Sequence, residues 1–144
     1  DNEVIIEEAI LGREVGCAII GKDILEVGLV DEIELADGFF DYHEKYTLKT
    51  SKIHLPARID ELTTKKIQDT AMLIYRTLGC QGFARVDMFL TNNNEIYFNE
   101  VNTIPGFTTH SRFPQMMKGI GYDFIELIDR IIEMGLKDGN DCTE

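Results

Sequence analysis

The sequence predicts an α+β domain in which a mainly antiparallel sheet is flanked by helices. Strand-like runs of alternating polarity follow one another across short turn-forming breaks, which is typical of antiparallel hairpins. Apolar residues at helical spacing mark later segments, and strands and helices do not alternate strictly along the chain. With 144 residues, of which 44% are hydrophobic, the chain is long enough to bury one core.

Three strand-like runs occupy the first part of the chain: Glu3–Glu8, Arg13–Lys22 and Ile24–Leu35. Gly21-Lys22-Asp23 separates the last two runs and predicts a hairpin turn. Residues 36–57 follow neither period, carry mixed charge and include four aromatic side chains. We expect a long loop there. Loops of this length inside compact domains are usually functional or disordered, and the aromatic content argues against plain disorder.

Helices are predicted in three places, each followed closely by a glycine or a polar stretch. Apolar residues follow helical spacing from about Thr63 to Leu78. A short helix is expected at Arg112–Lys118, and a last helix runs from about Phe124 to Met134. Asp123 and Glu126 have the spacing of a capping box at the start of that last helix.

The composition excludes several classes of function. A net charge of −12 argues against a nucleic-acid partner, because phosphate neutralisation needs clustered Lys and Arg. No apolar run approaches the roughly 20 residues that a membrane helix needs, so we expect no membrane partner. Cys17, Cys80 and Cys142 lie far apart without CxxC spacing. This spacing favours the interpretation that the cysteines pack as small apolar groups in a protein of the reducing cytoplasm. A disulfide scaffold or a zinc site is disfavoured.

A second predicted hairpin carries polar groups where a purely structural strand would carry apolar ones. The strand period of two places five side chains on one face: Arg85, Asp87, Phe98, Glu100 and Asn102. Two carboxylates and an amide oxygen are a hard-oxygen set suited to Mg²⁺, with other positions left for phosphate and water. A solvent-facing strand could be equally polar. The Gly- and hydroxyl-rich stretch after the hairpin, which can present N–H groups to an anion, favours a site.

The length of the loop sets the expected register of this hairpin. If Thr91–Asn94 form the loop, Asp87 faces Phe98 and Arg85 faces Glu100. Arg85 is then either a structural cross-strand partner of Glu100 or a group that stabilises charge on a transferring phosphoryl group or its acyl product. The residues alone leave both interpretations open, and the two roles are compatible.

Two other polar stretches also have two interpretations. Glu7–Ile10, with Glu14 just beyond, is either a set of edge-strand charges or a nucleotide-reading segment. In the second case the backbone reads an adenine edge and a carboxylate takes the ribose hydroxyls. The stretch around Lys45 and Tyr46 is either an apolar cluster under the long loop or a lid. Such a lid would bring Lys45 to a phosphate and Tyr46 to a substrate.

Taken together, these motifs resemble the C-terminal ATP-grasp portion of the D-alanine–D-alanine ligase family. The likeness rests on Arg85–Asp87, on Asn99–Thr108 (Asn-Glu-Val-Asn-Thr-Ile-Pro-Gly-Phe-Thr) and on Asp41–Tyr46 (Asp-Tyr-His-Glu-Lys-Tyr), and it extends over nearly the whole chain. It implies that residues 1–136 are the C-terminal part of the ATP-grasp domain of a longer ligase. Residues 137–144 are expected to be a frayed polar tail.

The same resemblance implies a role for each matched position. The implied ligands of two Mg²⁺ ions, which Mn²⁺ could replace, are Asp87, Glu100 and Asn102. The implied catalytic groups are Arg85, the backbone of Gly106 as an oxyanion donor, and Tyr46 of an omega loop. The implied ATP contacts are Glu7, Glu8, Ile10, Glu14 and Lys45. The residues implied to face the carboxylate of the second substrate are Ser111 and Arg112.

Two positions resemble the vancomycin-resistance members of the family. Ordinary D-alanine–D-alanine ligases typically have an apolar residue where this chain has Arg112, and Lys45-Tyr46 is similar to the D-serine type. The resemblance therefore implies ATP-dependent joining of D-alanine to D-serine through D-alanyl phosphate, in a cytoplasmic homodimer. In the family the first-substrate site and two lysines lie upstream, so we expect these residues alone to be inactive. An ordinary D-alanine–D-alanine ligase and a non-catalytic nucleotide-binding module are the alternatives.

Overall fold

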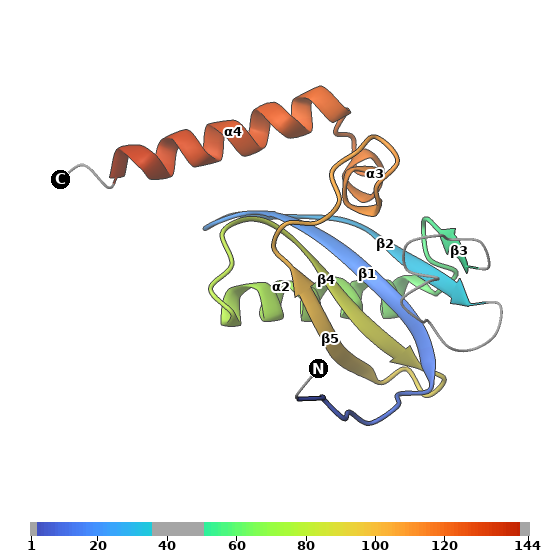
Figure 1. Cartoon of the computed structure of the whole chain (residues 1–144). Helices are drawn as coiled ribbons and strands as arrows, with labels where there is room; N and C mark the ends of the chain where they lie inside the picture. The colour runs from blue at the N-terminus through green and yellow to red at the C-terminus, as the bar shows by residue number, and fades with distance from the viewer. Residues whose placement is uncertain (1–2, 36–50, 142–144) are drawn as a thin grey trace.

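The computed structural model describes residues 3–35 and 51–141. Within these ranges a five-stranded antiparallel sheet with the strand order β3-β2-β1-β4-β5 carries helices on both faces (Figure 1). The strands are β1 Gly12–Gly21, β2 Leu25–Leu35, β3 Ser51–His54, β4 Gly82–Thr91 and β5 Ile96–Asn102. The described helices are α2 Glu61–Thr77, α3 Arg112–Lys118 and α4 Phe124–Asp141. This architecture confirms the predicted α+β class.

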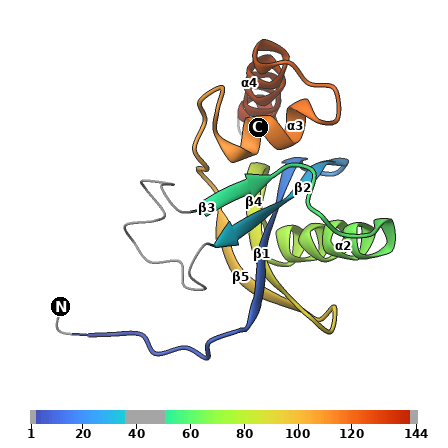
Figure 2. The same cartoon turned by 90° about the vertical axis from the view of Figure 1, so that its right-hand side faces the viewer.

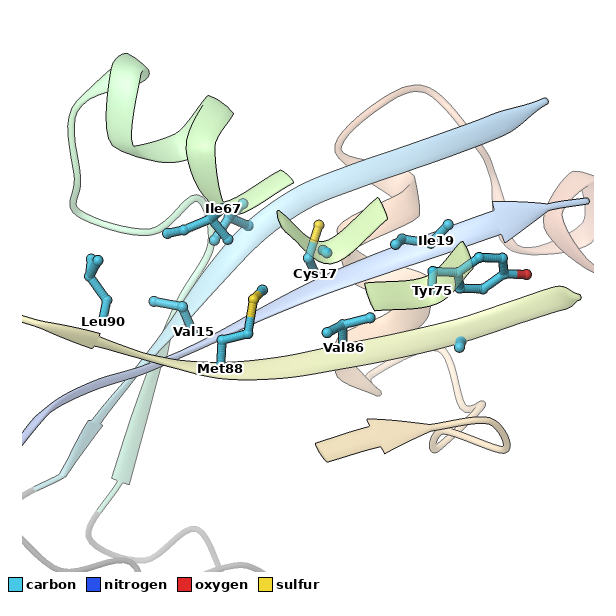
Figure 3. Packing of buried hydrophobic residues seen from close by; sticks show 11 residues of the cluster. Val15, Cys17, Ile19, Ile67, Tyr75, Val86, Met88 and Leu90 are labelled. Carbon is cyan, nitrogen blue, oxygen red and sulfur yellow. The ribbon is translucent and has the colours of Figure 1, made fainter. Parts of the chain in front are cut away.

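Helix α2 covers one face of the sheet, away from α3 and α4 (Figure 2). Alternate residues of β1 and β4 are apolar on that side and pack against α2 (Figure 3). The buried side chains of this cluster include Val15, Cys17, Ile19, Ile67, Val86, Met88 and Leu90. The Tyr75 hydroxyl of α2 donates a hydrogen bond to the carbonyl oxygen of Gly21 at 2.8 Å. The buried phenol therefore has a polar partner, as a hydroxyl in a core requires.

Helices α3 and α4 cover the opposite face near the Gly21 end of β1. The buried apolar residues there are Ala18, Ile20, Phe113, Met116, Met117 and Leu127. At the start of α4, the Asp123 amide donates to Glu126 Oε2 at 2.9 Å and the Glu126 amide donates to Asp123 Oδ1 at 2.8 Å. This is the predicted capping box. Because helices lie on both sides, the central strand β1 is buried on both faces.

Most of the predicted elements are confirmed. The first two paired strands and their turn agree with the expected hairpin, and α3 spans the predicted residues. Helix α2 begins at Glu61, earlier than expected, because Asp60 caps it: the Asp60 side chain accepts a hydrogen bond from the Thr63 amide at 2.8 Å. Residues 137–141, predicted to belong to a frayed tail, instead continue helix α4. No proline interrupts the helix there.

Two predictions about the first third of the chain need correction. Glu3–Glu8 is not a strand: residues 3–11 have no regular secondary structure, and Val4, Ile5 and Ile6 are 81–91% exposed. No strand among the described residues pairs with this segment, so its alternation finds no sheet. Ser51–His54, expected within the long loop, forms β3 and pairs with β2. Residues 36–50, with Lys45 and Tyr46, lie outside the described residues.

The register of the β4–β5 hairpin also differs from the expected one. Its polar pairs are Arg85 with Asn102 and Asp87 with Glu100. The next pair is Met88 with Phe98, so Asn99 is an extra residue in a β-bulge. Because Met88 belongs to the core beneath α2, the placement of Phe98 on the polar face is wrong. The other four predicted side chains do share the face opposite α2.

Candidate active site

A row of polar positions crosses the sheet on the face opposite α2. Pairing places Asp31 of β2 beside Gly16 of β1, Gly16 beside Asp87 of β4, and Asp87 beside Glu100 of β5. We call these four residues the carboxylate row. Neighbouring strands are about 5 Å apart, so three carboxylates share a short span. Asp31 and Asp87 are 1% and 0% exposed, and buried anions this close require cations, hydrogen-bond donors or a metal.

Arg85 supplies one of the cations. Its guanidinium holds Asp87 in a two-pronged contact, Nε to Oδ1 at 2.8 Å and Nη2 to Oδ2 at 2.7 Å. Paired planar groups of this kind are stronger and better oriented than single hydrogen bonds. The partner is thus Asp87 on the same strand, whereas the expected cross-strand neighbour of Arg85 was Glu100. Arg85 nevertheless keeps its guanidinium beside the candidate metal ligands.

The three predicted metal ligands converge. Asn102 Nδ2 donates to Asp87 Oδ2 at 2.9 Å and to Glu100 Oε1 at 3.3 Å, so its amide lies between both carboxylates. A half-turn of this amide would present its oxygen to the same point. Across the described ranges, no group of three or more His, Cys, Asp or Glu side chains could hold a metal alone. With the Asn102 amide turned in this way, the three residues would present oxygen ligands of the kind that Mg²⁺ prefers, and phosphate and water would complete the set.

Arg112, the first residue of α3, reaches the other end of the row. Its Nε and Nη2 donate to Asp31 Oδ2 and Oδ1 at 2.7 and 2.8 Å. Its Nη2 lies 3.4 Å from Asp87 Oδ1, and its Nη1 lies 3.4 Å from Glu14 Oε1. Burial disfavours the charged guanidinium, but the hydrogen bonds and charge of Asp31, then the charges of Asp87 and Glu14, raise the pKa of Arg112 above its ordinary value.

Asp31 and Gly16 are the functional candidates that the sequence reasoning missed. Asp31 accepts a further hydrogen bond from the Gly16 amide at 3.0 Å, which makes it a central partner of the row. A carboxylate inside the strand-like run of Ile24–Leu35 was the available signal. A charged residue in a central strand is rarely buried without a partner. The partner, however, is 81 residues away in sequence, at Arg112.

The turn between β5 and α3 is held by hydroxyl contacts. Ser111 Oγ accepts a hydrogen bond from the Thr108 amide at 3.0 Å and lies 2.9 Å from Thr108 Oγ1. Gly106 is exposed and faces this serine: a Cβ at Gly106 would lie 3.2 Å from Ser111 Oγ. The structure thus brings Gly106 and Ser111 together at the start of α3, close in sequence to Arg112. Their roles toward an oxyanion and a substrate carboxylate stay predictions.

The predicted nucleotide contacts are not gathered in the same way. Glu7 and Glu8 are exposed and Ile10 is half-buried in the irregular segment before β1. Glu14 is buried on the site face of β1, where Arg112 is one of its partners. Lys45 lies outside the described residues. Of the predicted ATP contacts, the structure therefore places only Glu14, among those described, against the carboxylate row.

Cys17 lies on the opposite side of β1 from Gly16, inside the core beneath α2. Burial, with the nearby charges of Asp31 and Asp87, raises the pKa of its thiol far above the ordinary value. A thiol held protonated in this way is a poor nucleophile. Its interpretation as a small apolar group is confirmed.

The antiparallel sheet with helices on both faces agrees with part of an ATP-grasp fold, and comparison with known proteins supports that fold class. The family described as "D-ala D-ala ligase C-terminus" matches residues 1–133. The chain belongs to this family. No described helix is long and apolar enough to cross a membrane.

Three similar proteins illustrate the range of the family. The VanG D-Ala:D-Ser ligase of Enterococcus faecalis is 64% identical, with a TM-score of 0.80 over 88% of this chain and 37% of that chain. The vancomycin C-type resistance protein VanC2 of Enterococcus casseliflavus is 47% identical over 91% of this chain and 37% of its own length. The D-alanine–D-alanine ligase of Bacillus anthracis, solved with ATP, is 29% identical, with a TM-score of 0.76 over 94% and 43% of the two chains. The chain thus spans about two fifths of the length of these relatives.

Proposed function

We propose that these residues form the metal- and phosphate-binding part of an ATP-dependent ligase that joins D-alanine to D-serine. The observation that carries the proposal is the cluster in which Arg85, Asp87, Glu100 and Asn102 meet on one sheet face. Family membership and the likeness to a D-Ala:D-Ser ligase at 64% identity support it. Vancomycin resistance through altered peptidoglycan precursors would be the corresponding biological role.

The proposed reaction has two group-transfer steps. The carboxylate of D-alanine attacks the γ-phosphorus of ATP, which gives D-alanyl phosphate and ADP. The amino group of D-serine then attacks the acyl carbon, phosphate leaves, and an amide bond forms with loss of a proton from nitrogen. In this proposal Arg85 stabilises charge on the phosphoryl and acyl groups. The Gly106 amide is the candidate donor to the acyl oxygen. Bound Mg²⁺ would neutralise phosphate charge beside Asp87, Glu100 and Asn102.

The preference for D-serine rests on Arg112. A hydroxymethyl group differs from a methyl group by one polar atom, and a site selects it by offering a hydrogen-bond partner. The buried pair of Arg112 and Asp31 offers both a donor and an acceptor at the second-substrate end of the row, where an apolar residue would offer neither. Ser111, one residue before, would meet the substrate carboxylate together with Arg112.

An ordinary D-alanine–D-alanine ligase is the second candidate, and the similarity to the Bacillus anthracis enzyme favours it. A non-catalytic nucleotide-binding module is less compatible with the chain, because it would have no need for Arg85 beside two carboxylates and an amide.

The test is product analysis with the full-length protein that contains these residues. It is incubated with ATP, Mg²⁺, D-alanine and D-serine, and dipeptides are identified by mass spectrometry. We expect D-alanyl-D-serine as the main product. D-alanyl-D-alanine as the main product would refute the D-serine assignment, and ATP binding without any dipeptide would refute ligase activity. We expect the 144 residues alone to form no dipeptide.

A further inference from the structure

Gly16 is the bare position of the carboxylate row. It is buried in the central strand β1, between Asp31 and Asp87. Its φ angle does not lie in the left-handed region, so the backbone does not require glycine here. Glycine inside a strand is less favourable than alanine, because it loses more conformational freedom on folding. The glycine is therefore explained by the groups that occupy the space above it.

That space is filled by the groups of the site. A Cβ at Gly16 would collide with Arg112 Nη2 and would lie 2.7 Å from Asp31 Oδ1 and 2.9 Å from Asp87 Oδ1. The guanidinium of Arg112 thus passes directly over the glycine on its way from one carboxylate to the other. The guanidinium is the far end of a long side chain with several rotatable bonds, so a methyl group would displace it before it displaced the backbone of β1.

We propose that Gly16 is a positioning residue: its missing side chain opens the slot in which Arg112 spans from Asp31 to Asp87. The slot links the second-substrate end of the site to its metal end. The inference rests on the proposed function, in which Arg112 selects D-serine and Asp87 binds Mg²⁺. It adds that Arg112 does not reach from Asp31 to Asp87 unless residue 16 lacks a side chain.

The two carboxylate oxygens of Asp87 face different groups. Asp87 Oδ1 faces Arg112, whereas Asp87 Oδ2 faces Asn102 at 2.9 Å. Arg112 therefore helps to hold Oδ2 on the side where the other two candidate metal ligands lie. The positive charge of Arg112 does not oppose a metal strongly, because the Asp31 carboxylate neutralises it at 2.7 Å. Displacing Arg112 should consequently weaken both the choice of D-serine and the binding of the metal.

The test compares Gly16→Ala with Gly135→Ala in the full-length protein. Gly135 is an exposed residue of α4 whose added Cβ would meet nothing within 4 Å, which makes it a matched control. The first readout is the ratio of kcat/KM for D-serine to that for D-alanine as second substrate. We expect Gly16→Ala to lower the ratio at least about tenfold, mainly through the KM for D-serine, and Gly135→Ala to leave it unchanged.

A double-mutant cycle separates the slot from a general packing defect. In an Arg112→Met background the slot holds no guanidinium, but an alanine at position 16 still meets Asp31 Oδ1 and Asp87 Oδ1. The change in the ratio that Gly16→Ala causes there measures the packing of the carboxylates alone, and we expect it to be clearly smaller than the change with Arg112 present. An equally large change with and without Arg112 would overturn the proposal, as would an unchanged ratio when Arg112 is present.

The second readout does not depend on ligation. Mn²⁺ affinity is measured in the presence of ADP from the electron paramagnetic resonance signal of free Mn²⁺. We expect Gly16→Ala to weaken binding at least about threefold because Asp87 loses one of its supports. Weaker binding in a protein that makes no D-serine product would refute the proposed function and support the slot. Unchanged ratio and affinity would refute the slot and leave the proposed function standing, and a parent protein that binds no Mn²⁺ would refute both.

If Gly16→Ala does not fold, Arg112→Lys takes its place. Lysine keeps a positive charge near Asp31 but lacks the planar fork that reaches Asp87 at the same time. We expect the same loss of D-serine preference and of Mn²⁺ affinity. Full retention of both by Arg112→Lys would overturn the proposal, because no bridge across Gly16 would then be needed.

Discussion

Replacing Asp31 by asparagine is the sharpest test of how the carboxylate row is held. Asp31 accepts two hydrogen bonds from Arg112 at 2.7 and 2.8 Å and one from the Gly16 amide at 3.0 Å. Asparagine has nearly the same shape but only one acceptor oxygen, and its NH₂ group would face the guanidinium donors. The change removes a buried negative charge and leaves Arg112 without its bidentate partner.

The size of the effect follows from these contacts. At least one charge-assisted hydrogen bond is lost, worth about 1.5–3 kcal/mol, and a donor is placed against a donor. Breaking a buried ion pair on one side costs about 3–5 kcal/mol in comparable cases. Since Asp31 is 1% exposed, we expect Asp31→Asn to lower the free energy of unfolding by about 3–5 kcal/mol. Replacing both partners, as Asp31→Leu/Arg112→Met, should recover part of this loss because the Asp31–Arg112 pair is then removed as a whole.

The assay is urea unfolding of the chain followed by circular dichroism, with the slope m compared among variants. The matched control is Asp129→Asn on the exposed surface of α4, which should change stability by less than about 0.5 kcal/mol. A loss below about 1 kcal/mol for Asp31→Asn would show that the pair is not buried as described. A double variant less stable than the single one would refute the argument from an uncompensated charge.

Three further predictions concern pH and the metal. Burial raises the pKa of Glu32, but hydrogen bonds and charge from Arg58 outweigh it and leave the pKa below its ordinary value. The stabilising contribution of Glu32 is therefore complete above its ordinary pKa and is lost as pH falls through the lowered pKa. In a plot of the free energy of unfolding against pH, Glu32→Gln should therefore flatten the decline on the acid side. Burial, with the nearby Cys80, raises the pKa of Tyr75 to about 12, so its contribution is complete below the ordinary value of 10.0 and is lost as pH rises toward 12. Tyr75→Phe should cost about 1 kcal/mol at neutral pH and flatten the alkaline limb, whereas the same change at the half-exposed Tyr97 should cost less at neutral pH. Asp87→Asn should weaken Mn²⁺ binding at least about tenfold in the resonance assay, and undiminished binding would contradict the metal assignment.

The elements that the sequence predicted well are those fixed by local signals. Helix α3 and the capping box of α4 are set by residues within a few positions of each other, as is the β1–β2 turn. The failure at Glu3–Glu8 has the opposite cause. Its alternation is strand-like, but a strand needs a partner to pair its backbone groups, and none of the described strands lies beside it.

The same distinction between local and long-range signals applies to the candidate site. Asp87, Glu100 and Asn102 could be predicted because a hairpin brings them together over a short stretch of sequence. The bulge at Asn99 could not be predicted, since one extra residue leaves the polar alternation after it intact while shifting Phe98 to the other face. Asp31, Gly16 and Arg112 come from three different elements, and only the long-range register of β1 with both neighbours aligns them.

The pairing of both site arginines bears on how this acidic chain could bind a nucleotide. Arg85 is held by Asp87 and Arg112 by Asp31, so the positive charge of each guanidinium is already shared with a buried carboxylate. Each guanidinium can add a contact to a phosphate group, but it offsets little of the triphosphate charge by itself because its carboxylate partner remains beside it. With a net charge of −12, we expect divalent metal ions to supply much of the counter-charge for ATP. Nucleotide affinity should therefore depend steeply on divalent metal, and ATP binding by the full-length protein that stays equally tight in EDTA would refute this account of the site.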